Sequence, residues 1–175
     1  ELPFFINLKK HLSSQGICCP EPIQNKSGHL INDIKDKPAL IVSFLSGATL
    51  KPEKNGIYST ITQEHCYEIG HNLALLHLSS GNFKEFREND IGVKKFHDLF
   101  SKMQYEIENY EPGLCAKIDQ YIKIIKDNWC ENLKSGAVHV DLFPDNVFFD
   151  ENSKVSGIID FYFAANDLLI YDLAI

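Results

Sequence analysis

The sequence predicts a mixed α+β fold, and three features of the chain support this prediction. The segments 93–110 and 114–129 carry apolar residues at alternating intervals of three and four, which is typical of amphipathic helices. The short apolar runs 147–149 and 155–159 flank a polar turn, which is typical of a β-hairpin. The nearly all-apolar run 39–45 predicts a central strand. The 175 residues are enough for one domain with a real core.

The N-terminal part is expected to mix a helix with short strands. Residues 2–12 have helical apolar spacing, and Pro3 fits the first turn of a helix. We predict a short strand at 28–31 and a turn at 35–38 before the strand 39–45.

A further helix is predicted to follow Thr62, which is a good N-cap, and to end near Gly81. His65, His71 and His77 lie along this helix at spacings unlike those of metal ligands, so we expect surface or packing roles for them. The seam at 93–110 would also suit an interaction helix or a coiled coil. A single seam this short is more often packed in a core, and we expect that here.

The composition limits the kinds of partner that we expect for this protein. The net charge is −7 and no segment forms a Lys/Arg stripe, so we expect no nucleic-acid partner. The five cysteines show no metal-ligand spacing, which favours free thiols in a reducing cytosol. The apolar runs are too short for a membrane span and no signal peptide is visible. We therefore expect a cytoplasmic protein without a membrane partner.

A few polar residues interrupt the apolar segment from 136 to 163: His139, Asp141, Asn146 and Asp160. Two carboxylates and an amide oxygen are hard ligands that suit Mg²⁺. The predicted hairpin would bring Asp160 back beside Asn146. One carboxylate could then orient an attacking hydroxyl while Asn146 and Asp160 hold the metal.

Each of these residues also has a plain structural interpretation. Taken alone, His139 would be a satisfied core histidine, Asp141 a loop cap, Asn146 a turn residue and Asp160 a residue at the end of a strand. Their order and separations together favour the catalytic interpretation.

The pattern His139-x-Asp141-x-x-x-x-Asn146, followed by a strand ending in Asp160-Phe161, resembles the phosphotransfer signature of protein-kinase-like enzymes. The longer stretch HVDLFPDNVFF…SGIIDFYFAANDLLIYDLAI closely resembles homoserine kinases of the aminoglycoside-phosphotransferase-like group. The resemblance extends over nearly the whole chain. It implies a partial, β-containing N-lobe at 1–46 and a mostly helical C-lobe at 47–175, which carries the catalytic hairpin.

The resemblance implies an activity, namely ATP- and Mg²⁺-dependent phosphorylation of the side-chain hydroxyl of L-homoserine to O-phospho-L-homoserine, a step of threonine biosynthesis. It implies that Asp141 is the catalytic base, that Asn146 and Asp160 hold the metal, and that His139 and Asp172 support the catalytic loop. The adenine edge is expected at the hinge between the lobes, near Ser43, Phe44 and Leu45. A plain buried strand remains the alternative for this segment.

The acceptor site is less well defined by the sequence. An amino acid needs a carboxylate partner, usually Arg, and Arg87 is the only arginine in the chain. Asp145, Asn166 and Asp167 are candidates for the ammonium group. Val140 stands where the resembled group commonly has a small residue, and we expect it to leave the loop geometry intact and to narrow the site.

Two other functions stay open at this stage. A related kinase could act on an aminoglycoside, choline or another small alcohol, or the chain could be a pseudokinase-like binding module without catalysis. No glycine-rich hairpin or strand lysine precedes residue 39, and the chain stops within a helical pattern. We therefore expect a fragment that by itself has little or no activity.

Overall fold

The computed structural model describes residues 1–54, 56–130 and 132–175. The α-helices are α1 (Leu2–Ser14), α2 (Gln63–Ser80), α3 (Val93–Tyr110), α4 (Leu114–Asn128) and α5 (Ile170–Ala174). The strands are β1 (Ile31–Ile34), β2 (Lys37–Leu40), β3 (Ala48–Thr49), β4 (Ser135–Val138), β5 (Val147–Phe149), β6 (Val155–Ile158) and β7 (Ala165–Leu168). Two short 3₁₀ helices are also present: η1 (Pro144–Asn146) precedes β5, and η2 (Phe161–Phe163) follows β6.

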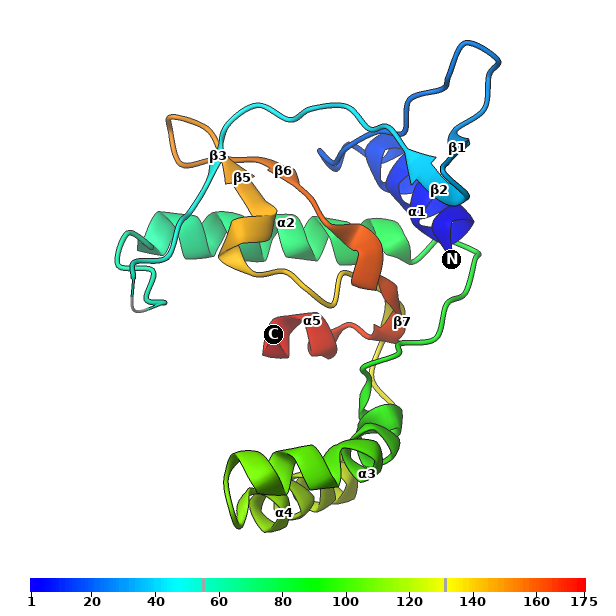
Figure 1. Cartoon of the computed structure of the whole chain (residues 1–175). Helices are drawn as coiled ribbons and strands as arrows, with labels where there is room; N and C mark the ends of the chain where they lie inside the picture. The colour runs from blue at the N-terminus through cyan, green and yellow to red at the C-terminus, as the bar shows by residue number, and fades with distance from the viewer. Residues whose placement is uncertain (55, 131) are drawn as a thin grey trace.

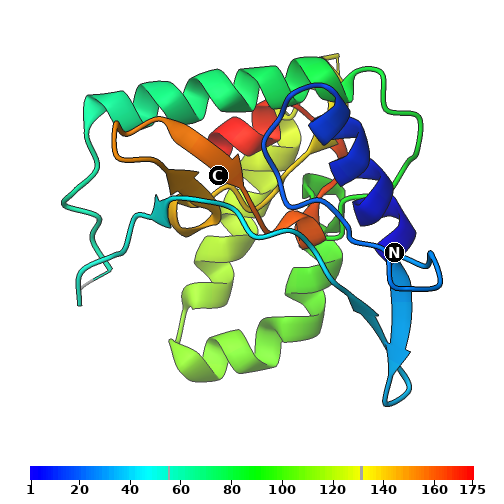
Figure 2. The ribbon, with the colours of Figure 1, turned by 90° about the horizontal axis from the view of Figure 1, so that it is seen from above.

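The strands form small antiparallel sheets rather than one large sheet. β1 pairs with β2, β5 lies between β3 and β6, and β4 pairs with β7. The predicted hairpin is present as β5 and β6, which lie beside the long helix α2 (Figures 1 and 2). The predicted helices at 2–12, 93–110 and 114–129 are likewise present, so the mixed α+β prediction is confirmed.

A continuous core joins the two predicted parts of the chain. Phe5, Leu8 and Leu12 of α1 pack in one cluster with Leu76 of α2 and Phe161 of η2. α1 therefore rests directly on the elements that carry the catalytic segment. The division into lobes at residue 46 stays a prediction.

Helix α2 begins with Thr62 as its N-cap, as predicted, and His65 is an unexpected partner of this cap. The hydroxyl of Thr62 accepts a hydrogen bond from the His65 amide, and the His65 ring accepts one from the Thr62 amide. His65 thus occupies the place that Glu usually takes in a capping box. Its ring also packs on Phe149, with centroids 4.7 Å apart, which fits the expected packing role.

Two strand predictions in the N-terminal part are wrong. The strand predicted at 28–31 begins only at Ile31, because the side chain of Asn25 accepts hydrogen bonds from the amides of Ser27 and His29 and holds a turn there. The run 39–45 is not a central buried strand: β2 ends at Leu40, and Phe44 is 94% exposed. Among the described residues, β1 is the only strand paired with β2. Beyond Leu40 the run meets residues 21–23 at the isolated bridge between Pro22 and Val42, where the Ile23 amide donates to the Ile41 carbonyl.

Helices α3 and α4 form an αα-hairpin that stands away from the rest of the molecule (Figure 1). Phe100 is the only buried residue of α3, and none of α4 is buried. The core packing expected for the seam 93–110 is therefore wrong for most of its length, because the seam packs mainly on α4. Among the described helices, none has the length and apolar character of a membrane span.

Gly47 lies where the chain passes close to the β5–β6 hairpin. Its backbone has φ +102°, a region that favours glycine. A Cβ added there would clash with Ser156 Oγ and would come within 2.5 Å of the Phe149 carbonyl oxygen. The Ser156 hydroxyl also donates a hydrogen bond to the carbonyl of Ser46, so this crossing is tight.

Candidate active site

Residues 139–146, the predicted catalytic segment, connect β4 to the β5–β6 hairpin. Pairing of β5 with β6 sets Val147 opposite Ile158, and the Ile159 amide donates a 2.9 Å hydrogen bond to the Asn146 carbonyl. The residue after Ile159 is Asp160. The hairpin therefore returns Asp160 to the neighbourhood of Asn146, as the spacing predicted.

Asp141 and Asn146 are joined directly. The side-chain amide nitrogen of Asn146 donates to the Asp141 carbonyl at 2.7 Å and to Asp141 Oδ2 at 3.0 Å. These bonds fix the orientation of the Asn146 amide. Its Oδ1 has no hydrogen-bond partner among the described residues and is left for another ligand.

His139 is fully buried and supports the segment from inside. Its Nε2 lies 2.8 Å from the Ile159 carbonyl, and its Nδ1 accepts from the Asp141 amide at 3.2 Å. These partners assign the neutral tautomer with the proton on Nε2. Burial lowers the pKa of His139 below its ordinary value, which also favours the neutral ring. His139 thus ties the catalytic segment to the residue before Asp160.

Asp172 holds the backbone at the start of the same segment. Its carboxylate accepts hydrogen bonds from the amides of His139 at 2.9 Å and Val140 at 2.7 Å, and it is 4% exposed. The Nε2 of His77 lies 2.8 Å from Asp172 Oδ2. A buried carboxylate with these donors is satisfied, so Asp172 has the geometry of a brace.

His77 is the residue that the sequence analysis left without a specific role. It lies one position after Leu76 and one turn after Leu73, both of which are buried. That placement on the apolar face of α2 was the available signal. Its partner, Asp172, is 95 residues away in the sequence, so helical spacing alone could not identify the pair.

Val140 has a left-handed backbone with φ +72°, which is rare and strained for a β-branched residue. Its side chain is 2% exposed and packs with Val138 and Ala165. It therefore lies in a small core cluster, and the expectation that it narrows the acceptor site is wrong. The bond from its amide to Asp172 helps to hold the turn that presents Asp141.

Asn146 and Asp160 together fit a divalent cation. Asp160 is exposed, and among the described residues no hydrogen bond or ion pair engages its carboxylate. Among the described residues, no group of three or more His, Cys, Asp or Glu is arranged so that it could hold a metal ion. The donor set is therefore a free amide oxygen and a free carboxylate, which suits Mg²⁺ carrying phosphate and water ligands.

Residues 43–45 lie in the extended stretch between β2 and β3. Ser43 is engaged with Glu21, because its amide donates to the Glu21 carbonyl at 2.9 Å and its hydroxyl accepts from the Glu21 amide at 2.9 Å. Within the described part of the chain, the backbone groups of Phe44 and Leu45 have no hydrogen-bond partner. The role of residues 43–45 at the adenine edge stays a prediction.

The predicted acceptor residues do not gather in one place. Asp145 is exposed in η1, whereas Asn166 and Asp167 are engaged with the segment that precedes α3. Asn166 accepts from the Arg87 amide at 2.8 Å, and Asp167 accepts from Asn89 at 2.8 Å. The acceptor roles stay predictions, and for Asn166 and Asp167 these bonds favour a structural role.

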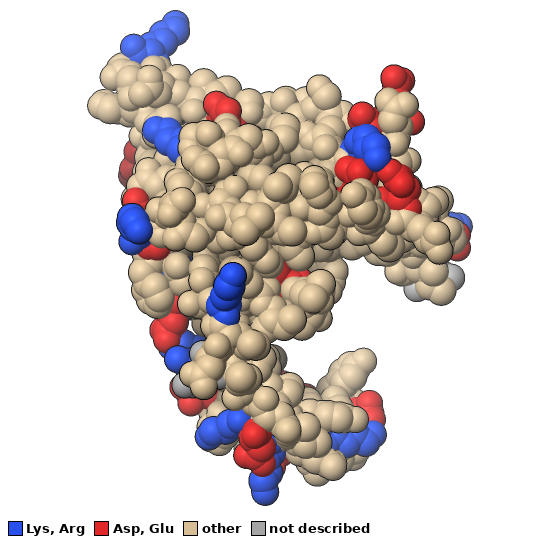
Figure 3. Space-filling view, turned by 180° about the vertical axis from the view of Figure 1, so that it is seen from behind, with Lys and Arg blue, Asp and Glu red and all other residues tan. Residues whose placement is uncertain are grey.

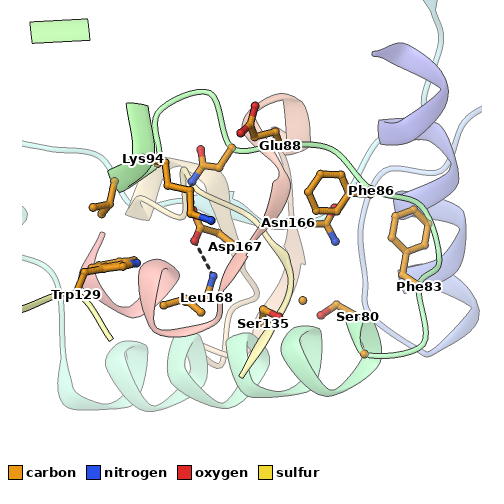
Figure 4. Close-up of a pocket in the computed structure, with 15 residues that line it drawn as sticks. Ser80, Phe83, Phe86, Glu88, Lys94, Trp129, Ser135, Asn166, Asp167 and Leu168 are labelled. Carbon is orange, nitrogen blue, oxygen red and sulfur yellow. Dashed lines mark hydrogen bonds between the residues drawn. The ribbon is translucent and has the colours of Figure 1, made fainter. Parts of the chain in front are cut away.

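Asn166 and Asp167 line a cavity of about 510 Å³ at the base of the α3–α4 hairpin (Figure 4). Ser80, Phe86 and Trp129 line it too, whereas Asp141, Asn146 and Asp160 are not among its lining residues. This cavity is separate from the proposed chemistry.

The side chain of Arg87, the only arginine in the chain, also makes structural contacts. Its guanidinium donates to the Ala164 carbonyl at 3.2 Å and to Asp90 at 2.6 Å, and it lies 5.2 Å from the centre of the Phe5 ring. On the face shown in Figure 3, basic and acidic groups are interspersed without a continuous basic stripe.

Comparison with known proteins identifies the family. Residues 1–175 match the phosphotransferase enzyme family. The chain belongs to this family. Its curated relatives include the homoserine kinases of Parvibaculum lavamentivorans, 42% identical over 175 residues, and Methylobacterium radiotolerans, 39% identical over 175 residues. Both alignments cover the whole of the present chain, but this chain spans only 52% of the length of each relative.

Solved phosphotransferases share the fold. The GDP complex of aminoglycoside 2'-phosphotransferase-IIIa matches with a TM-score of 0.71 and 18% identity, covering 95% of this chain and 57% of that one. Amicoumacin kinase hAmiN, in complex with AMP-PNP, Ca²⁺ and Ami, matches with a TM-score of 0.69 and 13% identity, covering 97% and 50%. The protein-kinase-like fold predicted from the catalytic signature is therefore confirmed.

Proposed function

We propose that the full-length protein containing these residues transfers the γ-phosphoryl group of ATP to the side-chain hydroxyl of L-homoserine, giving O-phospho-L-homoserine. The single observation that carries the proposal is the convergence of Asp141, Asn146 and Asp160 at the end of one hairpin. The substrate rests on the curated relatives, which are homoserine kinases about 40% identical over the whole chain.

In this mechanism the carboxylate of Asp141 binds the hydroxyl group of the substrate. One of its carboxylate oxygens, Oδ2, accepts from Asn146, and the other is left to accept a hydrogen bond from the substrate hydroxyl. The Asp141 carboxylate orients the hydroxyl oxygen toward the γ-phosphorus of ATP. It takes the hydroxyl proton as the new P–O bond forms and the bond from the γ-phosphorus to the β,γ-bridging oxygen breaks, which releases ADP. His139 and Asp172 keep the Asp141 backbone in place, so little reorganisation is needed when the substrate arrives.

Asn146 Oδ1 and the Asp160 carboxylate would hold Mg²⁺, which supplies positive charge against the phosphate oxygens. AMP-PNP and Ca²⁺ bound to the similar hAmiN support the use of a nucleotide with a divalent cation. We place the adenine edge at the open backbone of Phe44 and Leu45. We place the reaction in the cytosol, where the five free thiols would stay reduced.

An acceptor screen tests the proposal. The full-length protein is incubated with Mg²⁺ and ATP and, in separate reactions, with L-homoserine, choline or kanamycin, and ADP and the phosphorylated product are measured. We expect product from L-homoserine at a kcat/KM at least tenfold above the other two. Preference for choline or kanamycin would reassign the acceptor, and nucleotide binding without any product would indicate a binding module.

A further inference from the structure

Lys9 is a lysine in an unusual place. It lies on the buried face of α1 with Phe5, Leu8 and Leu12, and it is 4% exposed. Lysine is almost never buried to this extent unless it is paired. Across residues 1–54, 56–130 and 132–175, however, its ammonium group has no hydrogen bond and no ion pair.

The surroundings of Lys9 belong to the catalytic hairpin. Its Nζ lies 5.4 Å from the centre of the Tyr162 ring, and this ring packs edge-on against Phe5 with centroids 5.5 Å apart. Tyr162 is in η2, which begins directly after Asp160 and packs on α1. The ring therefore positions the ammonium group through a cation–π contact one short turn from Asp160.

Two ionisable groups face Lys9, and they differ in charge. Burial raises the pKa of the Cys19 thiol to about 12, so this thiol is neutral at pH 7. Asp160 is the other group, and its negative charge opposes the lowering of the Lys9 pKa by burial. Asp160 is thus the one charged partner of Lys9 among the groups that influence it.

We propose that Lys9 sets the affinity of the metal site by holding a fixed positive charge behind Asp160. This inference rests on the proposed function of Asp160 as a metal-binding carboxylate. Without the metal, the ammonium group and the Asp160 carboxylate attract each other without direct contact. With a divalent cation on Asp160, the same ammonium group repels the cation and weakens its binding. Lys9 would keep the metal–nucleotide complex from binding too tightly to be released.

The test compares Lys9→Met, which removes the charge and keeps the packing volume, with Lys10→Met as the matched control. Lys10 is the next residue on the same helix and is exposed. The substitution Lys10→Met changes the net charge by the same amount as Lys9→Met. The probe is Mn²⁺ with AMP-PNP, and free Mn²⁺ is measured by electron paramagnetic resonance in the full-length protein. We expect Lys9→Met to tighten Mn²⁺ binding about three- to tenfold, in line with loss of one nearby charge. Lys10→Met should match the unmodified protein within about 1.5-fold.

Each outcome is decisive. Equal Mn²⁺ affinity in the unmodified protein and Lys9→Met, or weaker binding in Lys9→Met, overturns the role of Lys9 while leaving the metal site standing. No Mn²⁺ binding by the unmodified protein overturns the proposed function itself. Lys9→Arg should retain the unmodified affinity because it retains the charge. Lys9→Gln replaces Lys9→Met if the latter does not fold, with the same tightening expected.

Discussion

The catalytic segment and the α3–α4 hairpin differ sharply in how they are held. His139 is 0% exposed, Val140 2% and Asp172 4%, and backbone amides and a side-chain carboxylate satisfy one another across 32 or more residues of sequence. The hairpin, in contrast, buries only Phe100. The backbone that precedes Asp141 is thus fixed by the interior, whereas the hairpin depends on contacts between its own two helices. The predictions below test that difference, from the largest expected effect to the smallest.

Asp141→Asn should lower kcat about 10²- to 10⁴-fold, because the amide cannot accept the hydroxyl proton. The free energy of unfolding should change little, since the bonds to Asn146 can be remade by an amide oxygen. Turnover of ATP in the presence of L-homoserine and urea unfolding measure the two effects. Asp119→Asn, on the exposed surface of α4, is the matched control. A kcat for Asp141→Asn near that of the control would remove Asp141 from the mechanism.

Asp172→Ala should destabilise the fold by about 3–5 kcal/mol, because it leaves the amides of His139 and Val140 buried without acceptors and His77 without its partner. It also removes a bond that holds the strained backbone of Val140. Denaturant unfolding measures the change against Asp119→Ala. A loss below about 1 kcal/mol would show that the interior does not fix the catalytic segment in the way described.

Stability should fall as the pH drops below about 6.5. The pKa of His139 is lowered by burial in the folded protein, so the unfolded chain binds more protons at acidic pH. The contribution is fully present above the unfolded pKa and is lost as the pH falls through it, by at most about 1.4 kcal/mol per pH unit. His139→Gln should flatten this dependence, and His97→Gln, at an exposed position of α3, should not. An unchanged slope in His139→Gln would contradict the assignment.

Tyr110→Ser should change the free energy of unfolding by no more than about 0.5 kcal/mol, because Tyr110 is 84% exposed at the end of α3. Hydrogen exchange should also show that the amides of α3 and α4 open at a lower free energy than those of β4. Equal protection of the α3–α4 hairpin and β4 would contradict the proposed difference in stability, since it would mean that both regions unfold only together.

The sequence predicted the local elements better than their surroundings. Helical spacing identified α1, α3 and α4, and the polar turn identified the β5–β6 hairpin that returns Asp160 to Asn146. These features depend on near neighbours in the chain. The prediction for the run 39–45 is wrong because a continuous apolar run favours a central strand, whereas β2 ends at Leu40 and an isolated bridge, Pro22–Val42, lies beyond it. The role of His77 was missed because it depends on a partner that only the folded chain brings near.

Gly47 links the two ends of the proposed nucleotide site. The stretch proposed to receive the base ends two residues before it, and the hairpin that presents Asn146 and Asp160 presses against it. Even a methyl group at Gly47 would clash with Ser156 and the Phe149 carbonyl. The stretch that precedes Gly47 can therefore approach the β5–β6 hairpin this closely only because Gly47 has no side chain. In the proposed nucleotide site, Gly47 would therefore set the distance between the stretch that receives the base and the residues that hold the metal.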